Sequence, residues 1–536
     1  MGPLSLSLSL SPSKGERVPF RAGEGNTVGS PKSHRSRCPS LKAALLCRGD
    51  TARQHATQAP SRANEISARV KVDAAHVVRT VDARLFGINA VMWDSCFDTP
   101  ETVSALRELD VQALRWPGGS PADDYHWALN RNGVNLWTWA TSFANFVHVA
   151  TNVRAQVFIT VNYGSGTPEE AAAWVRCANI TNHCGFKYWE IGNENYGNWE
   201  HDENSPPHDP VTYARRAKEY FRQMKAADPA IKIGVVAAMN WKERAGVVLD
   251  ALKQMQIGTF VTEGYQGWTP KLLATLKQLG VTPDFVICHR YPVSLSGWEN
   301  DASLLQSTAQ WTADAAALRR QLKTYFGTAN TNVELLCTEN NSIGEKTGKQ
   351  TTSLVNGLYL ADSFGQIAQT EFNSLLWYNL RNYQETNNNN RPALYGWRQY
   401  GDFGIMSGND TRYPTFYTFK LLKYFARGGD RIVRATSDHR LLSVYAARRA
   451  DGTLSLLVIN KSPGAALKAD FSIAGFQPES GAITYSYGIP QDEAARTGTG
   501  SPDIAQASFT GAAAEFPCNF SPYSATAIVL SPLPGK

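Results

Sequence analysis

Eight short apolar runs alternate with amphipathic segments between residues 83 and 427, and this alternation constrains the fold more than any other feature. Each run has the length of a buried strand, and several of the segments between them begin with clear helix-start signals. Eight strand–helix units predict an α/β fold, a (β/α)8 TIM barrel, with a doubly wound open sheet as the alternative. No glycine-rich phosphate loop follows the first run, which favours the barrel. The runs are Leu85–Asn89, Val111–Trp116, Ala155–Val161, Lys187–Asn193, Ile231–Val236, Asp284–His289, Val333–Thr338 and Ser374–Tyr378.

The helical periodicity ends near residue 427. Beyond it, segments of strand length are separated by Gly, Pro, Asp and Ser, which predicts an all-β sandwich over residues 428–536. Residues 63–82 also have a strand pattern, and we expect them to join that sandwich from the N-terminal side. The expected domains are therefore the tail 1–62, the joining strand 63–82, the barrel 83–427 and the C-terminal β-sandwich domain 428–536.

The positive charge of the chain is concentrated in its first 62 residues. The whole chain has a formal net charge of +6, whereas residues 1–62 contain ten Lys and Arg against three acidic residues. The remaining chain is close to neutral and has no nucleic-acid-binding motif, so we expect no nucleic-acid partner. The Ser- and Arg-rich tail is interpreted as a disordered or targeting segment, with an organelle transit peptide and a start codon placed too far upstream both left open.

No stretch approaches 18 consecutive apolar residues, so we expect no membrane partner. Eight cysteines in 536 residues do not form a disulfide scaffold. Cys177 and Cys184 flank a short loop, and a disulfide between them is an open question that would favour an oxidising compartment. No spacing of Cys and His is typical of zinc, so we expect no metal and no cofactor.

Two glutamates stand where predicted strands meet their loops. Glu194 follows the fourth run and Glu339 follows the seventh. Because the carboxyl ends of all barrel strands meet at one mouth, these two carboxyl groups are expected to face each other. Glycoside cleavage needs such a pair, one to protonate the departing oxygen and one to attack the anomeric carbon or to activate water. A glutamate at a strand end is by itself more often a solvated loop residue, so the pairing carries the argument.

These motifs resemble a known family. Gly192–Glu194 together with Thr338–Glu339 resembles the clan A retaining glycoside hydrolases. Arg115–Gly119 and Asp124–Trp127 are similar, more narrowly, to the family 51 α-L-arabinofuranosidases. The resemblance covers roughly residues 66–532, and the barrel followed by a sandwich agrees with it.

The resemblance implies roles for individual residues. Glu194 would be the general acid/base, Glu339 the nucleophile, and Asn193 a ligand of the sugar 2-hydroxyl. Tyr291 would orient the nucleophile and Trp377 would stack on the sugar. The implied substrate-binding residues are Asn193, His289, Tyr291, Trp377, Asn89 and Trp116. The family carries Glu near the end of the first strand and Asn after Pro-Gly-Gly, where this chain has Asn89 and Ser120.

Strand alternation adds an expectation of its own. It places Glu190 and Glu194 on one face, with Glu190 one layer deeper in the barrel. A buried glutamate needs a partner, and Arg115 at the end of the second run is the candidate. An acid/base must keep its proton near neutral pH, so we expect a raised pKa at Glu194.

The sequence therefore predicts a retaining glycoside hydrolase, specifically an α-L-arabinofuranosidase that acts on plant cell-wall polysaccharide by double displacement. The alternatives are another clan A activity, such as a β-xylosidase or an endo-glucanase, and a catalytically inactive carbohydrate-binding barrel. The expected partner is an oligo- or polysaccharide substrate, and the resemblance is compatible with a homo-oligomer. Such a substrate points to an extracellular or periplasmic location, although the tail is not a clean signal peptide.

Overall fold

A computed structural model describes residues 66–133, 141–239, 267–293 and 296–534. The interpretation of residues 1–62 lies outside these ranges. Within them, no helix is both long enough and apolar enough to cross a membrane. Cys177 and Cys184 are both free thiols, so the structure contains no disulfide between them.

Eight parallel strands close into a barrel, and each overlaps one of the eight predicted runs. The fold prediction is therefore confirmed, and the open sheet is excluded. Around the barrel the strands follow the order β10-β11-β2-β3-β6-β7-β8-β9. Their bounds are β2 Gly87–Asn89, β3 Ala113–Trp116, β6 Gln156–Val161, β7 Tyr188–Ile191, β8 Lys232–Val236, β9 Phe285–Arg290, β10 Glu334–Asn340 and β11 Phe372–Trp377.

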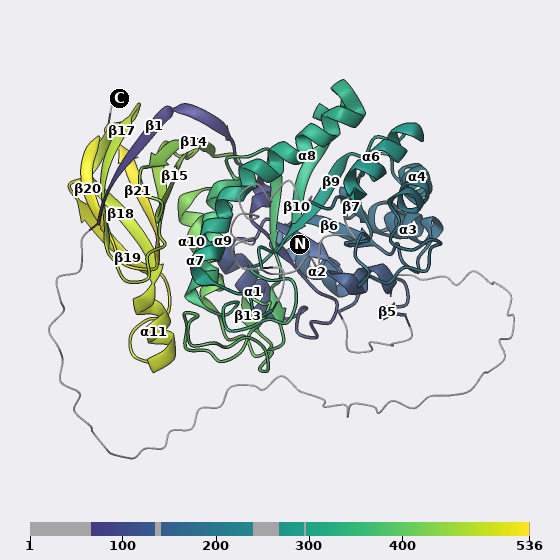
Figure 1. The fold of residues 1–536 in the computed structure, drawn as a ribbon, viewed down its shortest axis with the longest axis horizontal. Helices are drawn as coiled ribbons and strands as arrows, with labels where there is room; N and C mark the ends of the chain where they lie inside the picture. Colours follow the sequence, from purple (N-terminus) through teal and green to yellow (C-terminus); the bar gives the residue numbers. More distant parts are fainter. Residues whose placement is uncertain (1–65, 134–140, 240–266, 294–295, 535–536) are drawn as a thin grey trace, which may run out of the picture. The chain divides into compact units, whose positions relative to one another are not determined.

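Helices cover the outside of the barrel (Figure 1). Several begin at a polar side chain followed by proline; the hydroxyl of Thr99, for example, accepts the backbone N–H of Thr102, and the carboxylate of Asp209 accepts that of Thr212. Thr167 caps its helix in the same way. The helices are α1 Pro100–Leu109, α2 Phe143–Val153, α3 Pro168–Val175, α4 Pro210–Ala227, α6 Trp268–Gln278, α7 Asp301–Ser307, α8 Trp311–Phe326, α9 Leu354–Ile367 and α10 Pro414–Phe425.

The C-terminal segment forms a nine-stranded sheet in the order β19-β18-β21-β16-β15-β14-β1-β17-β20, which curls around its own apolar core. Strand β1, Ile66–Thr80, comes from the N-terminal side of the barrel and pairs antiparallel with β14 and parallel with β17 (Figure 1). The other strands are β14 Arg431–Ser437, β15 Leu442–Arg448, β16 Leu454–Asn460, β17 Leu467–Ala474, β18 Pro478–Gly488, β19 Ala505–Thr510, β20 Glu515–Phe520 and β21 Ser524–Pro532, with helix α11 Ile489–Thr497 between β18 and β19. Short pairs lie in the barrel loops, namely β4 Tyr125–His126 with β5 Arg131–Asn132, and β12 Arg381–Asn382 with β13 Met406–Ser407.

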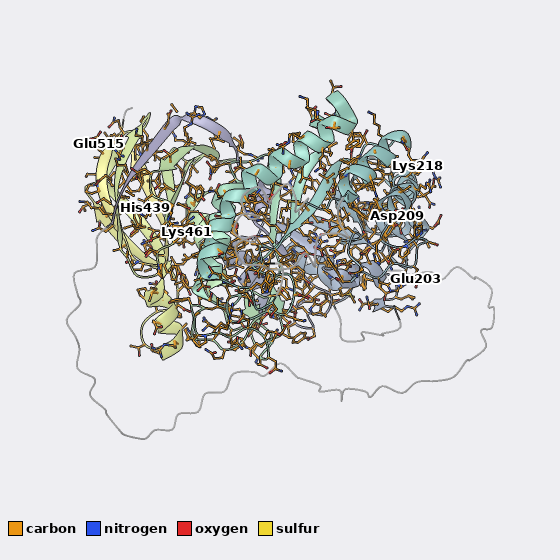
Figure 2. All side chains as sticks on the ribbon, viewed as in Figure 1. Glu203, Asp209, Lys218, His439, Lys461 and Glu515 are labelled. Carbon is orange, nitrogen blue, oxygen red and sulfur yellow. The ribbon has the colours of Figure 1, made fainter. Side chains whose placement is uncertain are left out.

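A buried polar cluster joins this sheet to the barrel helices. Asp362 of α9 accepts a hydrogen bond from the Tyr445 hydroxyl at 2.6 Å, and its other oxygen lies 3.1 Å from the Lys461 ammonium. The Thr308 hydroxyl donates to that second oxygen. Figure 2 labels Lys461 beside the helices that it contacts. Because the carboxylate has donors on both oxygens, its burial is compensated.

Ion pairs lie at the end of the barrel where the strands begin. Glu334, the first residue of β10, accepts from Arg84 at 2.7 Å and from Lys232, and Asn373 donates to it as well. Burial works against its charge, but these donors outweigh burial and lower the pKa of Glu334 to about 2. The folded-state pKa therefore lies below that of the unfolded chain, so this carboxylate stabilises the fold above about pH 4.5 and loses that effect as the pH falls toward 2.

Glu334→Gln is therefore expected to lower the melting temperature at pH 7 and to lower it much less at pH 3. Thermal unfolding followed by circular dichroism at the two pH values measures this. Glu493→Gln, which breaks an exposed i,i+3 pair with Arg496, is the matched control and should change little at either pH. An equal loss for Glu334→Gln at both pH values would contradict the assignment.

Candidate active site

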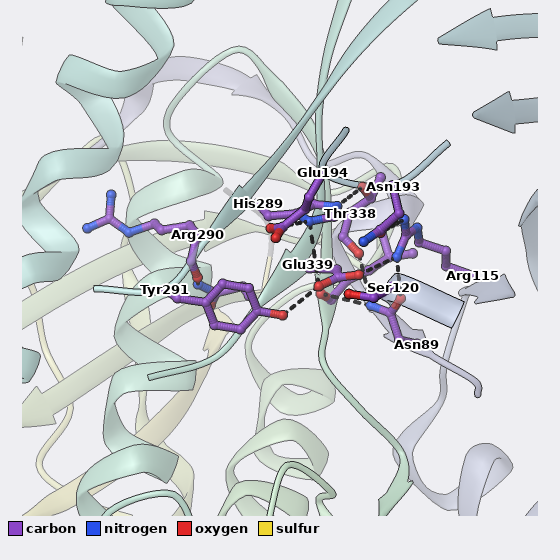
Figure 3. A network of polar contacts seen from close by, with 12 residues as sticks. Asn89, Arg115, Ser120, Asn193, Glu194, His289, Arg290, Tyr291, Thr338 and Glu339 are labelled. Carbon is purple, nitrogen blue, oxygen red and sulfur yellow. Dashed lines mark hydrogen bonds and ion pairs between the residues drawn. The ribbon is translucent and has the colours of Figure 1, made fainter. Parts of the chain in front are cut away.

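The structure brings Glu194 and Glu339 together at the mouth of the barrel. Glu339 lies in β10, and Glu194 follows the end of β7. One carboxylate oxygen of each lies within 4.8 Å of the other, and a ring nitrogen of His289 lies within the same distance of both (Figure 3). Two carboxyl groups 145 positions apart in the sequence thus share one small space.

A turn at Gly192 places Glu194 in this position. The backbone of Gly192 has φ +72°, and a Cβ there would lie 2.2 Å from Oδ1 of Asn195 and 2.8 Å from Oδ1 of Asp123. The buried Asp123 carboxylate accepts the backbone N–H of Asn193 at 3.0 Å and the Asn195 side chain at 2.8 Å. The turn between β7 and Glu194 is therefore built around one buried acid, and simple strand alternation does not extend to Glu194.

His289 lies between the two glutamates. Its Nδ1 is 2.9 Å from Oε1 of Glu194 and 3.5 Å from Oε2 of Glu339, while its Nε2 is 3.2 Å from the Thr338 hydroxyl. The Tyr291 hydroxyl donates to Oε2 of Glu339 at 2.5 Å. Figure 3 shows both side chains, His289 and Tyr291, converging on Glu339. The structure thus places these two predicted site residues in contact with the predicted nucleophile.

Arg115 lies beneath this cluster as a fully buried donor. It donates to Glu190 at 2.7 Å, which confirms the expected pair, and to Oε1 of Glu339 at 2.5 Å. Its remaining hydrogen bonds go to the side-chain oxygens of Asn193 at 2.8 Å and Asn89 at 3.1 Å. Burial opposes the charge of Arg115, but Glu190 and Glu339 outweigh it and raise its pKa. One guanidinium therefore holds the predicted nucleophile and two predicted substrate ligands.

Asn89 is fully buried, and its amide nitrogen donates to the Thr338 carbonyl at 2.9 Å. With both ends of its amide engaged, this side chain braces the strand that carries Glu339. Ser120, at the second position where the chain departs from the family pattern, donates to Oε1 of Glu200 at 2.8 Å.

The expected raised pKa at Glu194 is wrong for this structure. Burial is the largest single effect and acts to raise it, but the hydrogen bond and the charge of His289 act in the opposite direction. Further hydrogen bonds from Tyr196 and Trp199 favour the ionised form as well, so the pKa of Glu194 is lowered.

Two predicted sugar contacts lie in the protein core. Trp116 is fully buried between Phe146, at a ring-centroid distance of 5.2 Å, and Trp174, at 5.8 Å. Trp377 is 1% exposed and packs against Tyr359 of α9. Successive side chains of a strand point to opposite faces, so each tryptophan points toward the helices. The predicted contacts of Trp116 and Trp377 with sugar are therefore wrong.

Three site residues were not singled out from the sequence. Tyr378 follows Trp377 and lies at a ring-centroid distance of 6.5 Å from Tyr291. Trp199 is half exposed, and its indole N–H donates to Oε2 of Glu194 at 3.1 Å. Glu200 follows it. The alternation of β11 signals Tyr378, whereas Trp199 and Glu200 lie in a loop where no periodicity marks a side chain.

Glu194, His289 and Glu339 each have an atom that can bind a metal ion. The Glu339 oxygens, however, already accept from Arg115 and Tyr291. The site thus combines two carboxyl groups with the imidazole of His289 and the phenol of Tyr291. Groups of these kinds are suited to proton transfer and nucleophilic attack.

No protein-family model matches the sequence. α-L-Arabinofuranosidase C of Emericella nidulans is 25% identical over 190 residues, which are 30% of this chain and 36% of the relative. The chain spans about a third of the length of the curated relatives that it matches.

Solved structures extend the similarity of fold over most of the chain. The α-L-arabinofuranosidase of Thermotoga maritima, crystallised as an arabinose complex, matches with a TM-score of 0.64 and 18% identity, over 87% of this chain and all of that one. A family 44 xyloglucanase of Paenibacillus polymyxa matches with a TM-score of 0.60 and 14% identity, over 87% and 100%. The expected resemblance to α-L-arabinofuranosidases is thus confirmed in the aligned part of the sequence, and family 51 enzymes are among the solved structures that share the fold.

Proposed function

We propose that this protein is a retaining glycoside hydrolase that releases α-L-arabinofuranosyl residues from plant cell-wall polysaccharide. The observation that carries the proposal is the spacing of the two carboxyl groups, whose nearest oxygens lie within 4.8 Å. Retaining enzymes hold their carboxyl groups about 5–5.5 Å apart, whereas inverting enzymes need about 6.5–9.5 Å to admit a water molecule.

In the first step, a Glu339 oxygen attacks the anomeric carbon, and the bond to the leaving oxygen breaks as that oxygen receives a proton. Glu194 delivers this proton, and Nδ1 of His289 lies 2.9 Å from its Oε1. Arg115 and Tyr291 hold the Glu339 carboxylate from two sides and so fix its line of attack. In the second step, water gives a proton to Glu194 and attacks the same carbon, releasing Glu339 and the sugar.

A second candidate is an endo-acting clan A glycanase. Exposed aromatic rings on loops that follow three different barrel strands favour it, because such rings stack on the units of a long glycan. Trp199 follows β7, Trp298 follows β9 and Tyr383 follows β11, and they are 50%, 46% and 56% exposed.

A panel of aryl glycosides tests the proposal. We expect turnover of the aryl α-L-arabinofuranoside and none of the β-xyloside or the β-cellobioside. Turnover of the cellobioside instead would favour the glycanase. Sugar binding without turnover of any substrate would identify an inactive carbohydrate-binding barrel and overturn the proposal.

Glu194→Gln is expected to lower kcat about 10²–10⁴-fold on substrates with a poor leaving group, because those substrates depend on the general acid. A dinitrophenyl glycoside needs no protonation to depart, so its glycosylation step should be nearly unaffected. The basic limb of the pH–rate profile should also be lost. If both substrates slowed equally and the basic limb stayed unchanged, Glu194 would not be the acid/base.

A further inference from the structure

Glu200 is a third carboxyl group at this site, and the mechanism above does not use it. It lies in the loop after β7 and is 4% exposed. Its Oε1 accepts from the Ser120 hydroxyl at 2.8 Å and from the Asn193 amide nitrogen at 3.1 Å. Its Oε2 is enclosed and has no hydrogen-bond partner among the described residues. Both donors thus meet one oxygen, and the other is enclosed in the protein.

The charges around Glu200 are acidic. Burial, Asp123 and Glu194 all raise its pKa well above the usual range of a glutamate. The phenols of Tyr196 and Tyr378 also lie close enough to interact with its charge. No ion pair of Glu200 with Lys, Arg or His forms within the described part of the chain. A neutral acid fits these surroundings, with its proton on the enclosed oxygen and its carbonyl-like Oε1 accepting two hydrogen bonds.

The Asn193 amide lies between two groups that determine its orientation. Arg115 only donates, so it must meet the amide oxygen, at 2.8 Å. The amide nitrogen therefore turns to Glu200 and uses one of its two hydrogens there. No acceptor of the second hydrogen is found among the residues that the structure describes, so this hydrogen is left for a ligand.

We propose that Glu200 is a positioning residue that holds the Asn193 amide so that its second N–H meets a hydroxyl group of the bound sugar. This inference rests on the proposed glycosidase function. The substrate class that it implies is a glycoside with a free hydroxyl group beside the reacting carbon. Loss of the Glu200 proton would place a second negative charge beside Glu194.

A double-mutant cycle tests the inference, with kcat/KM on the aryl glycoside that the wild type turns over. We expect Glu200→Ala to lower kcat/KM about 10-fold or more, because the amide loses the acceptor that orients it. Asn193→Ala should lower it at least as much, and the double variant should be no slower than Asn193→Ala alone. Losses that simply multiply in the double variant would overturn the inference.

Glu200→Gln separates positioning from a merely structural role. Glutamine keeps the accepting Oε1 and is neutral at every pH, so this variant should stay within about threefold of the wild type at pH 6. Its pH profile should match that of the wild type over the range in which Glu200 is neutral, because neither side chain carries a charge there. A loss of kcat/KM as large as that of Glu200→Ala would contradict the positioning role.

Glu299→Ala is the matched control. Glu299 is equally buried, has one oxygen without a hydrogen-bond partner, and accepts from the backbone N–H of Gly297 in a different loop. Its replacement should lower the melting temperature as much as Glu200→Ala does without the same loss of kcat/KM. A wild type that turns over no glycoside would overturn the proposed function and this inference with it, whereas an active wild type with multiplying losses would overturn the inference alone.

Discussion

Replacing Glu339 with Gln is expected to lower kcat by at least about 10⁴-fold, and good leaving groups should not rescue it. The amide has nearly the same shape and still accepts a hydrogen bond from Arg115, but its oxygen is a poor nucleophile. Without attack on the anomeric carbon no glycosyl-enzyme forms, whatever the leaving group. This insensitivity to the leaving group distinguishes Glu339→Gln from Glu194→Gln.

Mass spectrometry locates the attacking oxygen independently of rates. A 2-deoxy-2-fluoro glycoside with an activated leaving group should add one sugar mass to the wild-type peptide that contains Glu339, and none to Glu339→Gln. The folded state of the variant is checked by its melting temperature. Sugar attached to any other residue would refute Glu339 as the nucleophile.

Arg115→Met is expected to have the largest effect on stability, lowering the free energy of unfolding by about 3–5 kcal/mol. The guanidinium is fully buried and donates to Glu190 and to Glu339, so its removal leaves two buried carboxylates without their cation. Activity should fall as well, since Glu339 loses one of its two positioning donors. Urea unfolding and kcat on the folded fraction measure the two effects.

Arg398→Met is the matched control for this prediction. Arg398 is also buried and pairs with one carboxylate, Asp492 at 2.9 Å, but it does not contact Glu339. The Arg398→Met variant should be less stable than the wild type and keep its kcat. The double variant Arg115→Met/Glu190→Gln should be more stable than Arg115→Met alone, but its kcat should stay low. A restored kcat in this double variant would show that Arg115 has no role in holding the nucleophile.

The eight barrel strands could be predicted because a buried parallel strand is a short apolar run whatever its neighbours are. The direction in which a side chain points at the end of a strand is harder to predict from the sequence. Trp116 follows Arg115 in the sequence, and Trp377 precedes Tyr378. Arg115 and Tyr378 point into the site, so an error of one residue in the alternation mistakes a core residue for a site residue. Sequence alone does not determine at which residue the alternation ends.

The electrostatics of the site depend on residues far apart in the chain. Glu194 has a lowered pKa because His289, 95 positions away, lies 2.9 Å from it. Glu200 has acids beside it because Asp123, from the loop after β3, and Glu194, after β7, lie close to it. Only the closed barrel sets these distances, so motifs could propose the two glutamates as catalytic while the lowered pKa of Glu194 could not be predicted.

The configuration of the first product tests the central claim most directly. Proton NMR, recorded during the first minutes of hydrolysis before mutarotation, resolves the two anomers of the released sugar. A double displacement through Glu339 predicts that the released sugar first appears with the same anomeric configuration as the substrate. A first product of the opposite configuration would mean that water attacks the anomeric carbon directly, and Glu339 could then not be the nucleophile.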